Sequence, residues 1–284
     1  MDVLAYAKLN LSLLVGAMQR DGYHPVDSLI QTIDLADRVT VDPLSTSEVV
    51  ARNSLGIPAS EDLGAAAARA VLAEAGSSMG VRVSIDKTIP VGAGLGGGSS
   101  DAAAVLVATN SLLDTPLPSQ DLHRLGASLG ADVPLFLTGG LLRATGRGET
   151  IHPSASIRSE TFVVIAPRVH CDTALVYRRF DEMPSCRSDV PSSSRPELAR
   201  NDLEPAAHDL YPDLIPIAAA TRSMVSEAGA LFAGMSGSGS SYFAAFRTTE
   251  QARQARSSLA ALLPDARLFL AHATPVGHEI GGRR

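Results

Sequence analysis

The chain has no tryptophan, two cysteines and little excess of either charge in its 284 residues. Cys171 and Cys186 show no Cys-x-x-Cys or Cys/His ligand spacing, which argues against a disulfide framework or a structural zinc site; we interpret both as free thiols. The formal net charge of -6 argues against the broad basic surface that nucleic acids and anionic membranes attract. No apolar run reaches the roughly 18 residues of a membrane span, and no secretion-signal pattern is present. We therefore expect a cytoplasmic protein with no nucleic-acid or membrane partner.

A glycine-serine stretch is the most informative feature that the chain does contain. An alternating, strand-like segment at 81–85 precedes it, and a segment without proline or glycine, Ala102 to Leu113, follows it as a helix. Glycines let the backbone approach an anion, and the free N–H groups at a helix start bind negative charge. The unit therefore predicts a phosphate-binding loop, formed by Pro90, Gly92, Gly94, Leu95, Gly96, Gly97, Gly98, Ser99 and Ser100.

Other glycine-rich motifs fit this stretch less well. A nucleotide P-loop requires Gly-Lys-Ser/Thr, and no lysine follows these glycines. Gly92, Gly94 and Gly97 match the dinucleotide fingerprint, but the following helix leads into a second helical pattern at 120–129 instead of a strand that ends in an acid. A purely structural glycine turn is the remaining alternative. We interpret Asp101, just after the serines, as a helix-start residue rather than a catalyst.

The hydrophobic periodicity predicts a mixed α and β protein. In the segment 4–13, Lys8 and Asn10 alternate with leucines, so we expect a strand with one polar face. The serine- and proline-rich segment Ser185 to Pro196 is interpreted as a mobile loop. Further strands are expected at 28–35, 37–41, 135–138, 141–145, 161–165, 242–246 and 266–271, and further helices at 60–76, 173–180, 195–208, 214–227 and 249–263.

Several separated motifs together resemble the GHMP kinases of small metabolites. The glycine-serine loop, Lys8-Leu9-Asn10 near the start and Gly234 to Ser241 near the end occur in that family's order. The resemblance covers essentially the whole chain. It is closest to the branch that phosphorylates the 2-hydroxyl of a cytidyl-diphosphate sugar alcohol in non-mevalonate isoprenoid precursor synthesis. The motifs that narrow it to this branch are Ala7 to Leu11, Arg20 to His24, Gly130 to Pro134 and Asn201 to Glu204.

The resemblance implies an α+β fold of two domains with the active site in the cleft between them. Residues 1–155 would form an N-terminal ATP-binding domain like the second domain of ribosomal protein S5. Residues 156–284 would form a ferredoxin-like C-terminal domain. The implied cofactors are ATP and Mg²⁺; no acidic pair at metal-ligand spacing is visible, so no metal ligand is assigned. The sequence is compatible with a monomer or a weak homodimer.

The resemblance also assigns roles to individual residues. Asp132 would act as the general base on the substrate hydroxyl, and Lys8 would keep it ionised and steady the transferred phosphoryl group. Asn10 would hydrogen-bond the substrate. Read alone, Asp132 would be a turn residue and Lys8 a surface charge. The substrate-binding loop near the C-terminus would use Gly237, Ser238 and Gly239.

Recognition of cytosine would distinguish this branch from its relatives. Tyr23 and Tyr177 would stack on opposite faces of the base, and His24 would hydrogen-bond its edge. Read alone, Asp-Gly-Tyr-His is an ordinary turn. The chain reads Glu61-Asp62-Leu63 where the family has Asp-Asn-Leu, so no adenine pocket is assigned. Alternative functions are another GHMP kinase, of the homoserine or mevalonate type, and a non-catalytic regulatory relative of this fold.

Overall fold

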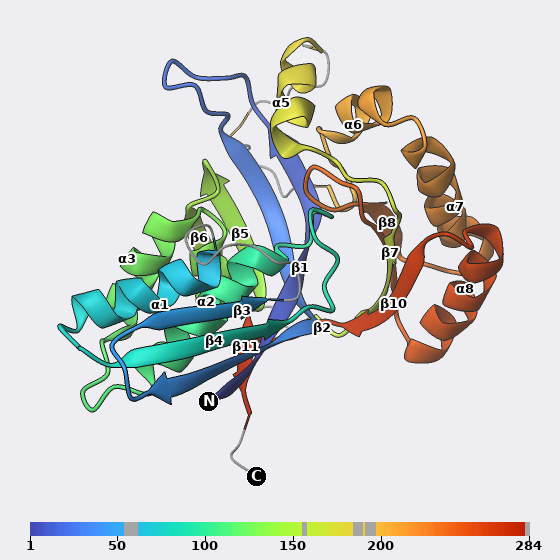
Figure 1. The fold of residues 1–284 in the computed structure, drawn as a ribbon. Helices are drawn as coiled ribbons and strands as arrows, with labels where there is room; N and C mark the ends of the chain where they lie inside the picture. Colours follow the sequence, from blue (N-terminus) through green and yellow to red (C-terminus); the bar gives the residue numbers. More distant parts are fainter. Residues whose placement is uncertain (54–61, 155–157, 184–189, 191–196, 282–284) are drawn as a thin grey trace.

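The computed structural model describes residues 1–53, 62–154, 158–183, 190 and 197–281. Cys186, Glu61 and most of the segment Ser185 to Pro196 lie outside these ranges. The described elements form two sheets with helices packed on each, as Figure 1 shows. Among the described helices, none is long and apolar enough to cross a membrane.

The first sheet is built around two long antiparallel strands, β1 (Asp2–Val15) and β2 (Val26–Leu44). Because β2 is so long, one half of it pairs with β4 and the other half with β5. The strand order is β11-β1-β2-β4-β3, with β5 and β6 continuing from β2. The remaining strands are β3 (Val49–Asn53), β4 (Gly80–Asp86), β5 (Leu141–Gly146), β6 (Thr150–Pro153) and β11 (His278–Ile280).

Helices cover one face of this sheet and bury its aliphatic side chains in a first core. The central helix α2 is rich in alanine and buried along most of its length, which lets it lie close to the sheet and to its neighbouring helices. These helices are α1 (Leu63–Glu74), α2 (Gly97–Asn110), α3 (Ser119–Leu129) and α4 (Val133–Thr138).

The second sheet is antiparallel, with the order β10-β7-β9-β8. All residues of β7 are buried, because helices cover one of its faces and the first sheet covers the other. Its strands are β7 (Thr161–Ala166), β8 (Phe232–Met235), β9 (Tyr242–Phe246) and β10 (Arg267–His272). Its helices are α5 (Thr173–Asp181), α6 (Glu204–Leu210), α7 (Leu214–Glu227) and α8 (Thr249–Leu262).

A third core joins the two sheets through β1. Leu9 and Leu11 of β1 pack in one buried cluster with Phe162 of β7 and Phe243 of β9. The phenylalanine rings meet edge to face, with centroids 6.2 Å apart. The leucine face of β1 is therefore fixed against the second sheet, which leaves its opposite, polar face to line a cavity.

Most of the expected elements are present, but some are wrong. Residues 28–41 form one continuous strand instead of two. The interruption expected between 35 and 37 is only a shift in the pairing register with β1, opposite Tyr6 and Ala7. The segment 135–138 is helical rather than a strand, with proline in the first turn of α4. The helix expected from 195 begins only at Glu204, because Ala199 and Asp202 donate backbone hydrogen bonds to β1.

The sequence prediction also missed four strands, β3, β6, β8 and β11. All four are short; β11 depends on long-range pairing with β1, whereas β6 and β8 pair in hairpins with β5 and β9. The proposed domain boundary at 155–156 falls on residues outside the described ranges.

Candidate active site

The glycine-rich loop between β4 and α2 needs glycine for reasons of geometry, as two of its positions illustrate. Gly94 and Gly96 have φ angles of 75° and 73°, in the left-handed region that side chains disfavour. A Cβ on Gly94 would lie 2.2 Å from the carbonyl oxygen of Ser236, and one on Gly96 would lie 2.7 Å from the ring of Phe136. The loop backbone thus packs directly on the rest of the fold.

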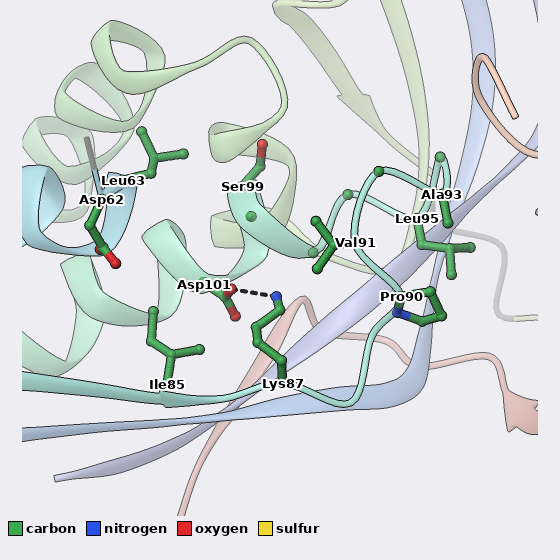
Figure 2. A pocket seen from close by; sticks show the side chains of 16 residues that line it. Asp62, Leu63, Ile85, Lys87, Pro90, Val91, Ala93, Leu95, Ser99 and Asp101 are labelled. Carbon is green, nitrogen blue, oxygen red and sulfur yellow. Dashed lines mark hydrogen bonds and ion pairs between the residues drawn. The ribbon is translucent and has the colours of Figure 1, made fainter. Parts of the chain in front are cut away.

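This loop walls a cavity of about 360 Å³, which we call the loop cavity. Figure 2 shows Asp62 and Leu63 at the start of α1 and Ile85 of β4 around it, with Ser99 on the first turn of α2. The first turn of α2 holds no acidic residue, and a Cβ on Gly98 would meet no protein atom within 4 Å. The positive end of a 14-residue helix is therefore open to an anion.

The structure separates the two serines of the motif. Ser99 lines the loop cavity. Ser100 is fully buried: its hydroxyl donates to the carbonyl of Tyr6 at 2.6 Å, and its amide donates to the carbonyl of Gly96 at 3.0 Å. Ser100 therefore anchors α2 to β1, and Ser99 is the one of the two serines that lines the loop cavity.

Lys87 and Asp101 meet at one wall of the loop cavity, as the dashed line in Figure 2 shows. The Lys87 ammonium contacts Asp101 at 2.6 Å and also the buried carboxylate of Asp37. Burial raises the pKa of Asp101 to about 7; Lys87 opposes this rise and Asp37 adds to it. Asp101 lies within α2, whose N-cap is Gly96, so the helix-start interpretation was wrong and the residue belongs to this buried cluster.

A second cavity, of about 280 Å³, borders the first, and we call it the cleft cavity. Gly94 and Gly96 line both cavities, so the glycine loop is their common wall. From the polar face of β1 come Lys8 and Asn10, and from the turn before α4 comes Asp132. Residues predicted from separate motifs are therefore brought together here: Lys8, Asn10, Asp132, Tyr177, Gly237 and Ser238 all line the cleft cavity.

Lys8 has an environment unusual for a lysine. It is 5% exposed, and its ammonium donates to the side-chain oxygen of Asn10. Burial lowers the pKa of Lys8, while the nearby charge of Asp132 acts in the opposite direction. Asn10 is in turn fixed by a hydrogen bond from its amide to the hydroxyl of Ser28 at 2.8 Å. The lysine is therefore held in a fixed position at the cavity wall.

The loop between β8 and β9 packs on the glycine-rich loop. Ser236 donates to the carbonyl of Gly94 at 2.9 Å and accepts from the backbone of Asn10 at 3.1 Å. Asn201 also holds the loop between β8 and β9, because its side-chain amide donates to the carbonyls of Met235 and Gly237 at 2.9 and 2.8 Å. Gly237 and Ser238 thus line the cleft cavity, whereas Gly239 lies behind them, against the sulfur atoms of Met235 and Cys171.

The three residues expected to recognise a base lie around α5 and the hairpin between β1 and β2. Tyr177 lines the cleft cavity, and burial, with the charge of Asp132, raises its pKa to about 12. The ring of His24 packs against Tyr177 with centroids 5.2 Å apart. Its two nitrogens face the carbonyl of Gly16 at 2.9 Å and Asp181 at 3.4 Å.

Tyr23 is 55% exposed and does not line the cavity itself. The guanidinium of Arg147 covers its ring, 4.2 Å from the centroid. Sequence reasoning missed Arg147, Lys87 and Thr173, which line the two cavities. Glycines flank Arg147, and Lys87 lies three residues before the motif; their roles depend on partners far away in the sequence.

Comparison with known proteins gives a consistent result. The model of the GHMP kinases N terminal domain matches residues 62–140, and that of the GHMP kinases C terminal domain matches residues 191–265. A 4-diphosphocytidyl-2-C-methyl-D-erythritol kinase of Desulfitobacterium hafniense is 39% identical over 264 residues, 89% of each chain. One of Burkholderia mallei is 37% identical over 268 residues, 92% of this chain and 90% of the relative.

Solved structures agree. A crystal structure of 4-(cytidine 5'-diphospho)-2C-methyl-D-erythritol kinase matches with a TM-score of 0.82 and 36% identity, over 96% of this chain and all of the other. A homoserine kinase from Cytophaga hutchinsonii matches with a TM-score of 0.74 at 20% identity, over 98% and 96% of the two chains. At that identity the second match supports a common fold only.

Proposed function

This chain belongs to the GHMP kinases, in the group of the 4-diphosphocytidyl-2-C-methyl-D-erythritol kinases, and from this premise we propose how its two cavities divide the reaction. It is an ATP-dependent kinase whose substrate is 4-diphosphocytidyl-2-C-methyl-D-erythritol. In our proposal the loop cavity binds ATP, the cleft cavity binds the cytidyl substrate, and the γ-phosphoryl group passes to the 2-hydroxyl of the sugar alcohol.

The observation that carries this division is the wall that the cavities share. Gly94 and Gly96 line both, so an ATP whose phosphates lie along the loop presents its γ-phosphate to the cleft. Phosphoryl transfer needs in-line positioning and stabilisation of spreading charge more than covalent chemistry. In our proposal, the amides at the start of α2 and the ammonium of the buried Lys8 stabilise that negative charge.

Asp132 is the group that we propose to accept the proton of the hydroxyl. Among the described residues, Asp132 carries the one carboxylate that lines the cleft cavity. Its negative charge acts on Lys8, where it opposes the lowering of the lysine pKa by burial. As the proton moves to Asp132, the ammonium of Lys8 remains to stabilise the transferred phosphoryl group. Asn10 holds Lys8 in place and presents its fixed side chain to the substrate.

For the base, we propose a wall formed by Tyr177 and Tyr23. Tyr177 reaches the cavity directly, with His24 packed behind it. Because both nitrogens of His24 face protein oxygens, we propose that its ring orients Tyr177, and a side-chain hydrogen bond to the base would require one of these contacts to open. Gly237 and Ser238 would close the cavity beside the substrate, and Gly239 would support their loop from behind.

Magnesium is the remaining proposed component. Among the described residues there is no cluster of three His, Cys, Asp or Glu side chains suited to a metal. We therefore propose that Mg²⁺ is held chiefly by the phosphates of ATP and by water, with the hydroxyl of Ser99, a residue that lines the loop cavity, as the protein ligand. Bound there, the ion would neutralise phosphate charge.

We also propose that the enzyme works as a monomer or weak homodimer, since one chain supplies both cavities. Its proposed location is the cytoplasm.

The test is a coupled assay of ADP formation with purified protein, ATP, Mg²⁺ and the cytidyl substrate. We expect turnover, and we expect Asp132→Asn to lower kcat by about 100-fold to 10,000-fold while ATP affinity stays within a factor of two. Homoserine and mevalonate serve as control substrates. Turnover of either in place of the cytidyl compound, or full activity of Asp132→Asn, would overturn the proposal.

A further inference from the structure

We propose that Arg147 binds the diphosphate of the cytidyl substrate, and this inference rests on the function proposed above. Arg147 lies in the turn between β5 and β6 and lines the cleft cavity. Of the side chains that line this cavity within the described ranges, the charged ones are Lys8, Asp132 and Arg147. A diphosphate carries at least two negative charges, so its binding site needs a cation beyond the one at the reacting hydroxyl.

Lys8 does not meet that need. It is almost fully buried, bonded to Asn10 and under the influence of Asp132, which commits it to the reacting end of the cavity. Arg147, in contrast, has a side chain that is 50% exposed. Within the part of the chain that the structure describes, its guanidinium nitrogens contact one acceptor, Asp21, at 2.6 Å. The planar guanidinium therefore has further N–H donors to offer, in a geometry that suits phosphate oxygens.

The order of groups along the substrate fits this position. The molecule runs from base to ribose to diphosphate to sugar alcohol, so its diphosphate must lie between the base-binding wall and the reacting hydroxyl. Arg147 covers the ring of Tyr23, part of the proposed base-binding wall, and lines the same cavity as Lys8 and Asp132. It is therefore placed between the two ends.

The turn that carries Arg147 is fixed before any ligand arrives. Gly146 and Gly148 have φ angles of 74° and 104°, and the amide of Gly148 donates to the carbonyl of Thr145 at 3.1 Å. The amide of Arg147 itself donates to the side chain of Glu149 at 2.5 Å. A side chain held from both ends, by its turn and by Asp21 and Tyr23, loses less freedom when it binds an anion.

The contrast with Arg143, four residues earlier on β5, supports a ligand-binding role. Arg143 makes two contacts, of 2.8 and 2.5 Å, with both oxygens of Asp27, which is fully buried. That pair is part of the structure, because losing the arginine would leave a buried charge alone. The partner of Arg147, Asp21, is exposed and needs no such compensation.

The experiment compares Arg147→Met with Arg124→Met, an exposed arginine of α3 that pairs with Glu74 and lines neither cavity. We expect Arg147→Met to raise the KM for the cytidyl substrate by about tenfold to about a hundredfold, the loss of charge-assisted hydrogen bonds. The KM for ATP and kcat should stay within a factor of two. Arg124→Met should behave as the wild type in all three.

Competition by cytidine and by CDP separates anion binding from support of Tyr23. If Arg147 binds the diphosphate, Arg147→Met weakens inhibition by CDP at least fivefold more than inhibition by cytidine, while Tyr23→Ala weakens both alike. Equal loss for the two inhibitors in Arg147→Met would mean that the arginine acts only through Tyr23, and would overturn the inference. If CDP fails to compete with the wild type, the proposed function itself is wrong, which is a distinct outcome.

Discussion

Two glycines of the proposed phosphate-binding loop, Gly96 and Gly98, should respond to alanine in opposite ways. Gly96 has a left-handed backbone, and its Cβ would lie 2.7 Å from the ring of Phe136 and 3.1 Å from the side chain of Lys8. Gly98 is an exposed residue in the first turn of α2, and its Cβ would meet no protein atom within 4 Å. The first position is occupied by protein, and the second is open for the ligand.

The magnitudes follow from these contacts. A left-handed alanine costs about 1 to 2 kcal/mol, and overpacking adds about 1 to 3 kcal/mol, so Gly96→Ala should lower the free energy of unfolding by about 2 to 5 kcal/mol. Alanine in a helix is favoured over glycine by about 0.5 to 1 kcal/mol, so Gly98→Ala should leave the protein as stable as the wild type or slightly more so. In the proposed ATP site, however, its methyl group would lie where phosphate oxygens approach the helix amides.

Urea unfolding and ATP titration measure the two effects separately. Gly98→Ala should raise the KM for ATP about tenfold, the equivalent of one charge-assisted hydrogen bond, with unchanged stability. The matched control for Gly96→Ala is Gly229→Ala. Gly229 also has a positive φ, 69°, but its Cβ would meet nothing closer than 3.9 Å, so this variant measures the backbone strain without the clash. An unchanged KM for ATP in Gly98→Ala would show that no phosphate lies at this helix start.

Two further substitutions test the surroundings of the site. The pKa of Asp101 is raised to about 7 from an ordinary 3.8, so its bound proton stabilises the folded state at low pH. The free energy of unfolding should therefore fall as pH rises from about 4 to about 7, and Asp101→Asn should show a smaller fall. The slope of the unfolding free energy against pH should differ between the two proteins by up to about 1 kcal/mol per pH unit. Equal slopes in the two proteins would contradict the raised pKa. Asn201→Ala removes two hydrogen bonds to the loop that carries Gly237. We expect it to lower the free energy of unfolding, measured in urea, by about 2 to 3 kcal/mol and to raise the KM for the cytidyl substrate. A decrease in the unfolding free energy of less than about 0.5 kcal/mol would show that the loop holds its conformation without Asn201.

The sequence sufficed where a local pattern decides the structure. The alternation in β1 predicted a polar face, and Lys8 and Asn10 do line a cavity while Leu9 and Leu11 pack in a core. The glycine-rich loop was also predicted from a local pattern, a run of glycines directly before an alanine-rich helix. Asp132 was predicted from the resemblance to the family's motifs, and it lines the same cavity as Lys8 and Asn10.

The rest depended on contacts between distant residues. Lys87 joins Asp37 and Asp101, 50 and 14 residues away, and no local pattern marks that cluster. Arg147 meets Asp21 across 126 residues. The helix α4 was taken for a strand because six mostly apolar residues show no period, and the proline in its first turn was the overlooked indication.

The pairing of β11 with β1 has a consequence for biosynthesis. Tyr6, two residues before Lys8, donates its hydroxyl to Glu279 and its amide to the carbonyl of Gly277. On the ribosome, β1 emerges before these partners, with the other described elements between them, so this edge of the nascent sheet stays uncovered while that intervening chain is made. A chaperone that shields exposed strand edges would therefore be most useful before β11 has been synthesised.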